Sequence, residues 1–205
     1  PFRQDSDFHY LTGFDHPSAA LVLRKDGAPT CTLFVEPRDP DAETWTGYRP
    51  GVEGAVSDFG ADEAHPIGAL VEKLPKLLEG AKRVLHVLGR DAKIDAKLFE
   101  TADLARIRSR AGITAPDAVV DPRAILHEMR LFKEPEELDI MRRAAEISRE
   151  GHEAAAKLAR EGVYEYELAA ALDYTFRRRG GAGPAYETIV ASGANACVLH
   201  YNANN

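Results

Sequence analysis

Two short apolar runs near the start of the chain predict a β-hairpin. They cover residues 19–23 and 31–35, and they flank a turn at 26–29 that contains an Asp-Gly pair. Apolar runs joined by Asp-Gly are typical of two antiparallel strands with a tight turn. The next segment, 39–62, is rich in Gly, Pro and Asp and is therefore expected to be mostly loop.

The rest of the first half alternates between helical and strand-like patterns. Apolar residues recur on one helical face over 67–78, and 95–106 is also helix-like. Between them, the apolar residues of 84–88 predict a short buried strand. This alternation favours an α/β layer domain that ends near residue 120.

Residues 135–181 predict two consecutive helices. Pro135 suits a first helical position, where its missing N–H would have no partner, and Gly162 is a natural stop. A second helix is expected from Glu165 to the Arg/Gly run at 177–181, where cations favour the helix C-terminus.

The last residues carry the strongest candidate for chemistry. Two strand-like runs, Thr188–Ala191 and Ala196–Tyr201, are joined by a Gly/Asn-rich turn, and His200 lies at the edge of the second run. A histidine there can donate to a substrate or shuttle its protons. The residues alone leave open a second interpretation, in which His200 is a structurally satisfied histidine.

Composition excludes several functional classes. The 205 residues carry a net charge of −7, whereas duplex-binding domains usually show a basic excess, so no nucleic-acid partner is expected. No apolar run approaches the roughly 18 residues of a membrane helix, so no membrane partner is expected. Cys31 and Cys197 show no metal-binding spacing and predict reduced, buried thiols in a cytoplasmic protein.

Two X-Pro boundaries divide the chain into predicted domains. Asp121-Pro122 and Glu134-Pro135 mark a junction at 121–134, because a residue that precedes proline disfavours helix. The domains are predicted to span 1–120 and 135–205. The chain begins without Met and directly with a dense aromatic stretch, so we expect it to be an internal piece of a longer protein.

Five segments of the chain match, in order, the motifs of one protein family. They are 2–14, 42–47, 109–116, 127–137 and 186–201. The most diagnostic is the last, with the pattern Tyr-x-x-Ile-Val-x-x-Gly-x-Asn-x-x-x-Leu-His-Tyr. The chain resembles the Xaa-Pro aminopeptidases (aminopeptidase P) among the creatinase/prolidase "pita-bread" metallopeptidases.

The resemblance implies a fold, a reaction and a cofactor. It implies a creatinase-type α/β domain with a mixed sheet and helices, followed by the beginning of an α+β pita-bread catalytic domain. It implies removal of the N-terminal residue from peptides with proline in second position, by two divalent ions, usually Mn²⁺. The five ligands of these ions lie beyond the family's equivalent of Asn205, so this chain would hold no metal ligand. A homo-oligomer, dimer or tetramer, is also implied.

The resemblance also assigns roles to three side chains. His200 would be the catalytic, substrate-binding histidine near the metals. Trp45, the only tryptophan, would reach the active site of a neighbouring subunit, and the alternative is a ring that caps a core edge. Arg110 would face the mouth of the active site and bind a peptide carboxylate or another acidic group, and the alternative is a solvated arginine.

Two other functions stay open. A prolidase would cleave only Xaa-Pro dipeptides. A pita-bread domain without peptidase chemistry would be a binding module.

Overall fold

The computed structural model describes residues 2–25, 27, 29–108, 110 and 112–205. Its contacts divide the chain into two compact units, Pro1–Phe132 and Lys133–Asn205. This division lies inside the segment in which the sequence predicts a junction.

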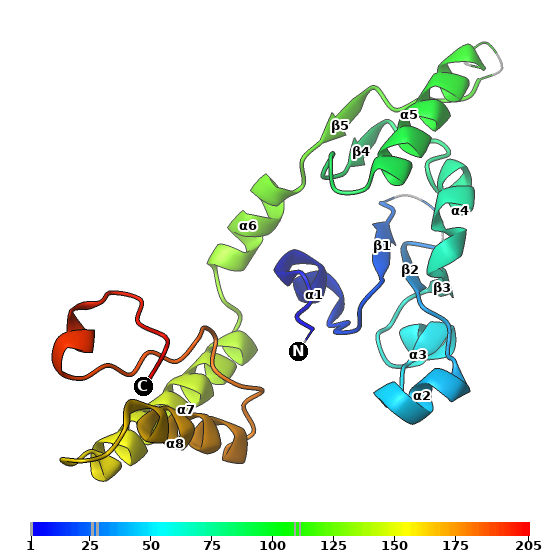
Figure 1. Ribbon diagram of the computed structural model, residues 1–205. Coiled ribbons are helices and arrows are strands. Elements are labelled where there is room, and N and C mark those ends of the chain that lie inside the picture. Colours follow the sequence, from blue (N-terminus) through cyan, green and yellow to red (C-terminus); the bar gives the residue numbers. More distant parts are fainter. Residues whose placement is uncertain (1, 26, 28, 109, 111) are drawn as a thin grey trace. The chain divides into compact units, whose positions relative to one another are not determined.

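Helices and strands alternate through the N-terminal unit (Figure 1). In chain order its elements are α1 (Ser6–Thr12), β1 (Ala20–Leu23), β2 (Cys31–Val35), α2 (Pro40–Thr46), α3 (Gly51–Ser57), β3 (Glu63–Pro66), the 3-10 helix η1 (Ile67–Ala69), α4 (Leu70–Leu77), β4 (Arg83–Leu85), α5 (Ala92–Ile107), β5 (Ala118–Val120) and α6 (Arg123–Leu131). The helices expected over 67–78 and 95–106 are confirmed by η1 with α4 and by α5.

Three strands of this unit form a mixed sheet in the order β1-β2-β3. β2 runs antiparallel to β1, with Leu21 opposite Leu33, and parallel to β3, with Leu33 opposite Ala64. Both strands of the predicted hairpin are therefore confirmed, and Asp26 and Ala28 of its turn lie outside the described residues. β4 and β5 form a separate parallel pair.

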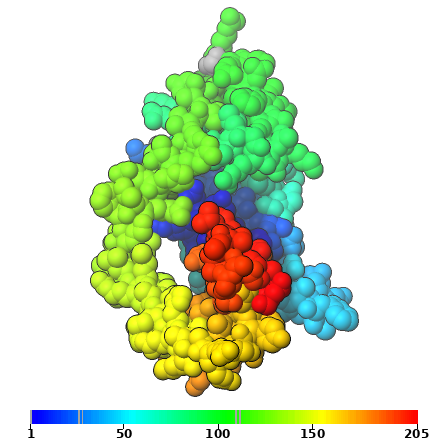
Figure 2. Space-filling model, turned by 60° about the vertical axis from the view of Figure 1, so that its left-hand side comes forward, coloured from blue at the N-terminus to red at the C-terminus, as the bar shows by residue number. Residues whose placement is uncertain are grey.

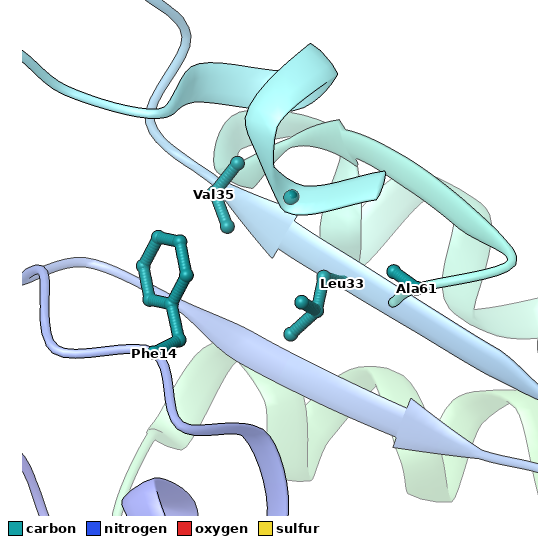
Figure 3. Close-up of a cluster of buried hydrophobic side chains, with 5 residues drawn as sticks. Phe14, Leu33, Val35 and Ala61 are labelled. Atoms are coloured by element: carbon teal, nitrogen blue, oxygen red, sulfur yellow. The ribbon is translucent and has the colours of Figure 1, made fainter. Parts of the chain in front are cut away.

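The core of the N-terminal unit is built around β2. Residues 32–35 are all at most 1% exposed, so this central strand is buried on both faces. A strand buried on both faces has a mostly apolar sequence and does not alternate between apolar and polar residues. One side of the strand contributes to a cluster of five buried side chains (Figure 3), namely Phe14, Leu33, Val35, Ala55 and Ala61. The cluster joins the chain before β1 to β2 and α3.

Residues 39–62 are not the loop that their composition predicts. The Asp39 side chain accepts two backbone N–H groups of the first turn of α2, and Pro40 takes the first helical position. In α3, a Cβ added to Gly54 would lie 2.6 Å from the Cβ of Pro50. Glycine and proline in this segment therefore start helices and allow close packing, and they do not mark an irregular chain.

Two predictions of burial are wrong. The strand expected at 84–88 is shorter, and Leu85 and Leu88 are about half exposed. The two cysteines are free, as expected, but Cys31 is only half-buried and Cys197 is exposed. Apolar character identified these positions, but their neighbours in the fold cover them only in part.

The segment predicted as the junction, 121–134, contains α6, which contacts α1 within the N-terminal unit. The Asp7 carboxylate accepts a hydrogen bond from the Arg130 guanidinium and lies 3.4 Å from the His127 ring nitrogen Nε2. Asp7 is largely buried, so the ion pair with Arg130 is partly shielded from solvent.

The C-terminal unit begins with the two helices that the sequence predicts. Its elements are α7 (Pro135–Leu158), α8 (Glu165–Arg178) and the 3-10 helix η3 (Gly193–Cys197). At the start of α7 the N–H of Glu134 donates to the Glu137 carboxylate at 2.9 Å, so glutamate replaces the Ser or Thr of a common cap. After α8, Gly180 adopts the left-handed conformation at φ 90°, which favours glycine at a helix end.

The packing of α7 against α8 depends on Gly151. This residue is buried, and a Cβ added to it would lie 2.6 Å from the ring carbon Cε1 of Phe176 and 3.3 Å from Leu172 Cδ2. We expect Gly151→Ala to destabilise the protein by about 1–3 kcal/mol through overpacking, less the roughly 1 kcal/mol that alanine gains in helix propensity. Urea unfolding would measure this loss.

The ring of Phe176 provides the control for this prediction. Phe176→Leu in the Gly151→Ala background removes the atom that the new methyl would meet, and it should recover part of the stability. A higher urea midpoint for Gly151→Ala would contradict the conclusion that α7 and α8 pack too closely at this position to accept a methyl group.

Candidate functional site

The segment that carries His200 is a loop that contains one short 3-10 helix, η3. All of residues 133–205 are described, and this range contains no strand, so the strands predicted at Thr188–Ala191 and Ala196–Tyr201 are wrong. A strand needs a partner to satisfy its backbone groups, and no strand of this unit lies beside these runs. Figure 2 shows the segment (orange to red) at the surface.

A side-chain amide replaces part of the missing strand pairing. Asn204 accepts a hydrogen bond from the Val190 N–H at 2.8 Å and donates to the Thr188 carbonyl at 2.9 Å. The side chain thus satisfies one donor and one acceptor of the extended segment, as a neighbouring strand would. Asn204 itself has φ 50°, a left-handed conformation that asparagine tolerates better than most residues.

A buried carboxylate holds the other side of the loop. Glu165, in the first turn of α8, is 3% exposed. Its Oε1 accepts the Ser192 N–H at 2.6 Å and the Ser192 hydroxyl at 3.0 Å, and the Asn195 amide donates to both oxygens at 3.2 and 3.3 Å. The first turn of a helix is also a favourable place for negative charge.

These hydrogen bonds keep Glu165 ionised. Burial raises the pKa of its carboxyl, because it penalises the charged form. Hydrogen bonds from Ser192, Asn195 and Tyr201 oppose this effect, and the net pKa lies below the ordinary value.

His200 lines an open pocket of about 560 Å³ together with four neighbours, Tyr186, Glu187, Ile189 and Asn202. The Asn202 amide donates to the Glu187 carboxylate and joins the two sides of the pocket. The lining combines a ring nitrogen and a carboxylate with aromatic and aliphatic surface. Such a surface can bind an apolar group while His200 donates or accepts a proton.

The two other predicted site residues belong to the N-terminal unit. Trp45 lies on α2 and is 89% exposed, so the alternative that it caps a core edge is wrong. The same helix is held to the chain that precedes it, because the Arg38 guanidinium makes two hydrogen bonds to the carboxylate of Glu43, at 2.9 and 2.8 Å. Arg110 is exposed. Their roles at an active site stay predictions.

Sequence reasoning missed Glu165 and Asn204 as parts of the site. Glu165 was expected only as the start of a helix, and its partners on the loop lie 27 and 30 residues away. The only local signal for Asn204 is the run of asparagines that follows His200.

The part of the chain that the structure describes does not by itself supply the metal centre that the resemblance implies. Within 2–25, 27, 29–108, 110 and 112–205, no group of three or more His, Cys, Asp or Glu side chains is placed to hold a metal ion. Glu165 and Glu187 are engaged by amide and hydroxyl donors of the loop.

Among the described residues, no helix is both long and apolar enough to span a membrane.

Comparisons with known proteins match both units. Residues 1–86 match the family model "Aminopeptidase P, N-terminal domain", and 139–205 match "Metallopeptidase family M24". The Xaa-Pro aminopeptidase of Escherichia coli is 42% identical over the whole chain, which covers 47% of that protein. The chain therefore spans about half the length of this relative.

Solved structures give the same result. The structure of Pseudomonas aeruginosa aminopeptidase PepP matches with a TM-score of 0.90 and 43% identity, over 100% of this chain and 47% of that one. The zinc-substituted E. coli aminopeptidase P in complex with product matches with a TM-score of 0.88 and 41% identity, over the same shares. The predicted fold class, a creatinase-type α/β domain followed by the beginning of a pita-bread domain, is confirmed. Residues 1–86 therefore match the N-terminal domain of aminopeptidase P, and residues 139–205 match the M24 metallopeptidases.

Proposed function

We propose that this chain is part of an Xaa-Pro aminopeptidase, which removes the N-terminal residue from peptides with proline in second position. The observation that carries the proposal is the match of both units, over 100% of the chain, to a relative named Xaa-Pro aminopeptidase. The open pocket at His200 supports it, because Tyr186 and Ile189 offer apolar surface beside a proton donor.

In this proposal His200 is the catalytic residue that this chain contributes to the active site. Its ring donates a hydrogen bond to the substrate or the intermediate, where negative charge develops on the attacked carbonyl group. Trp45 and Arg110 are proposed as further substrate contacts, the first by ring stacking and the second by binding a carboxylate. The high exposure of Trp45 leaves its ring free for such a contact.

The metal ions of the proposed enzyme are two divalent ions, which we propose to be Mn²⁺. The M24 match supports a divalent metal. Because the described residues supply no ligand set, we propose that the ligands lie outside this chain, in the further length that the relatives possess. When bound, such ions activate water and polarise a carbonyl group.

We also propose a cytoplasmic homo-oligomer, a dimer or tetramer. The two free cysteines fit a reducing compartment. The exposed aromatic side chains of Trp45 and Tyr48, at 89% and 62%, suit an interface between subunits.

The full-length protein that carries this chain provides the test. Purified with Mn²⁺, it should hydrolyse a tripeptide of the type Xaa-Pro-Yaa and lose this activity when the metal is chelated. A matched peptide with alanine in place of proline is the control, and it should be a poor substrate.

Three outcomes would contradict the proposal. Cleavage of Xaa-Pro dipeptides with no cleavage of the tripeptide would indicate a prolidase. Binding of a proline-containing peptide without any turnover would indicate a binding module. Full activity after complete removal of metal would exclude a metallopeptidase.

A further inference from the structure

Glu165 is the one charged side chain in the described part of the chain that is almost completely buried, at 3% exposure. Burying a carboxylate is costly unless donors replace the water that it loses. The rest of the chain shows no general need for such a group, because the other buried side chains are apolar apart from Thr32. A buried charge at this place therefore calls for an explanation.

The hydrogen-bond donors that reach Glu165 come from Ser192, Asn195 and Tyr201, in the loop that carries His200. The Ser192 N–H and hydroxyl bind one oxygen, and the Asn195 amide spans both. None of these donors belongs to α8, so the hydrogen bonds of the carboxylate stabilise the loop and not the helix that carries it.

The hydrogen bonds continue from Glu165 to the residue beside His200. The Asn195 amide, which donates to Glu165, also donates to the Tyr201 hydroxyl at 3.0 Å. The same hydroxyl accepts the N–H of Asn205 at 3.1 Å. Tyr201 follows His200 directly in the chain, so fixing the Tyr201 side chain restricts the backbone that carries the histidine.

We propose that Glu165 is a positioning residue for His200, acting through Asn195 and Tyr201. This inference rests on the proposed function, because it assigns Glu165 a role in that same site. It explains why a loop without strand pairing can hold a proton donor in one place, as catalysis requires.

A carboxylate suits this task better than its amide. The ionised group only accepts hydrogen bonds, and every group that faces it is a donor. In Glu165→Gln one oxygen becomes an NH₂ group that meets the donors of Asn195 or Ser192. The loop must then shift or lose a hydrogen bond, although the side chain keeps its size.

The experiment compares Glu165→Gln with Glu167→Gln in the full-length protein. Glu167 lies in the same turn of α8, is exposed, and only accepts the N–H of Tyr164 at 2.8 Å. Glutamine also serves at that capping position. We expect kcat to fall about 10-fold or more in Glu165→Gln, the scale typical of groups that orient a functional side chain, and to stay unchanged in Glu167→Gln.

A double-variant cycle tests whether Glu165 acts through His200. If it does, Glu165→Gln should cause little further loss of kcat in a His200→Ala background. A full additional loss in the double variant would overturn the proposal, because Glu165 would then act independently of the histidine.

A third measurement does not depend on activity. Hydrogen exchange of peptides from 186–205 should accelerate in Glu165→Gln and not in Glu167→Gln. Unchanged exchange would overturn the positioning role, whatever the substrate. A wild-type protein that fails to cleave Xaa-Pro peptides, with the expected exchange result, would contradict only the proposed function.

Asn195→Ala is the second variant if Glu165→Gln does not fold. It removes the bridge from Glu165 to Tyr201 through the Asn195 amide, but leaves the Ser192 contacts and the Tyr201 hydrogen bond with the carboxylate. We expect faster exchange near His200 and a loss of kcat, both in the same direction as in Glu165→Gln. Wild-type values of both would overturn the proposal.

Discussion

His200→Ala in the full-length protein is expected to lower kcat/KM by about 100-fold or more, the usual scale for removing a positioned acid–base or oxyanion-contacting group. The ring lines the pocket beside Tyr186 and Asn202 and is exposed to an incoming peptide. Metal content should stay near the wild-type value, because the histidine is proposed as a donor to the substrate and not as a ligand. Steady-state kinetics and metal analysis on the same preparation would measure both.

Two further variants make the assignment to His200 specific. His152→Ala, an exposed histidine on α7, should leave kcat/KM unchanged. His200→Asn should recover part of the loss if hydrogen bonding dominates, and almost none if proton transfer does. Wild-type turnover in His200→Ala would make the residue structural, whereas loss of bound metal would make it a ligand.

Phe14→Ala is expected to destabilise the N-terminal unit by about 3–5 kcal/mol, the typical cost of truncating a buried phenylalanine. The ring is 2% exposed and lies 4.9 Å from the ring of Phe59 and 6.5 Å from that of Phe8, centroid to centroid. It also packs in the cluster that includes Leu33 (Figure 3). Its removal would leave a cavity where three segments of the chain meet.

Denaturant unfolding of the protein would measure this loss. Phe99→Ala on α5, where the ring is 53% exposed, is the matched control and should cost much less. Phe14→Leu should retain most of the stability because it keeps apolar volume. Equal costs for Phe14→Ala and Phe99→Ala would contradict the position of the core.

Periodicity predicted those elements whose signals are local. The helix that begins at Pro135 has its proline and acidic residues in the first turn, and its boundaries depend on neighbouring residues. The hairpin of 19–23 and 31–35 is equally local. The prediction failed at 39–62, because proline and glycine in a sequence usually indicate the end of a helix or strand. Here glycine is needed for a close contact, that of Gly54 with Pro50, which only the structure shows.

The site was predictable only where a motif identified it. His200 was found because the segment around it matches a family pattern. The strand expected before His200 and the strand expected to contain it were wrong, because an apolar run becomes a strand only beside a partner, and the sequence does not reveal whether one is present. Glu165 was missed because its role depends on Ser192 and Asn195, which approach it only in the folded chain.

The tryptophan on α2 has a spectroscopic consequence. Trp45 is the only indole among the 205 residues, and its side chain is almost completely exposed to water. It lies on α2, and Glu43 of this helix is hydrogen-bonded to Arg38. The tryptophan fluorescence of this chain therefore comes from a single, known position. An indole that moves from water into apolar surroundings emits at shorter wavelength, so a blue shift on mixing with a peptide or on self-association would report contact at α2 without any label.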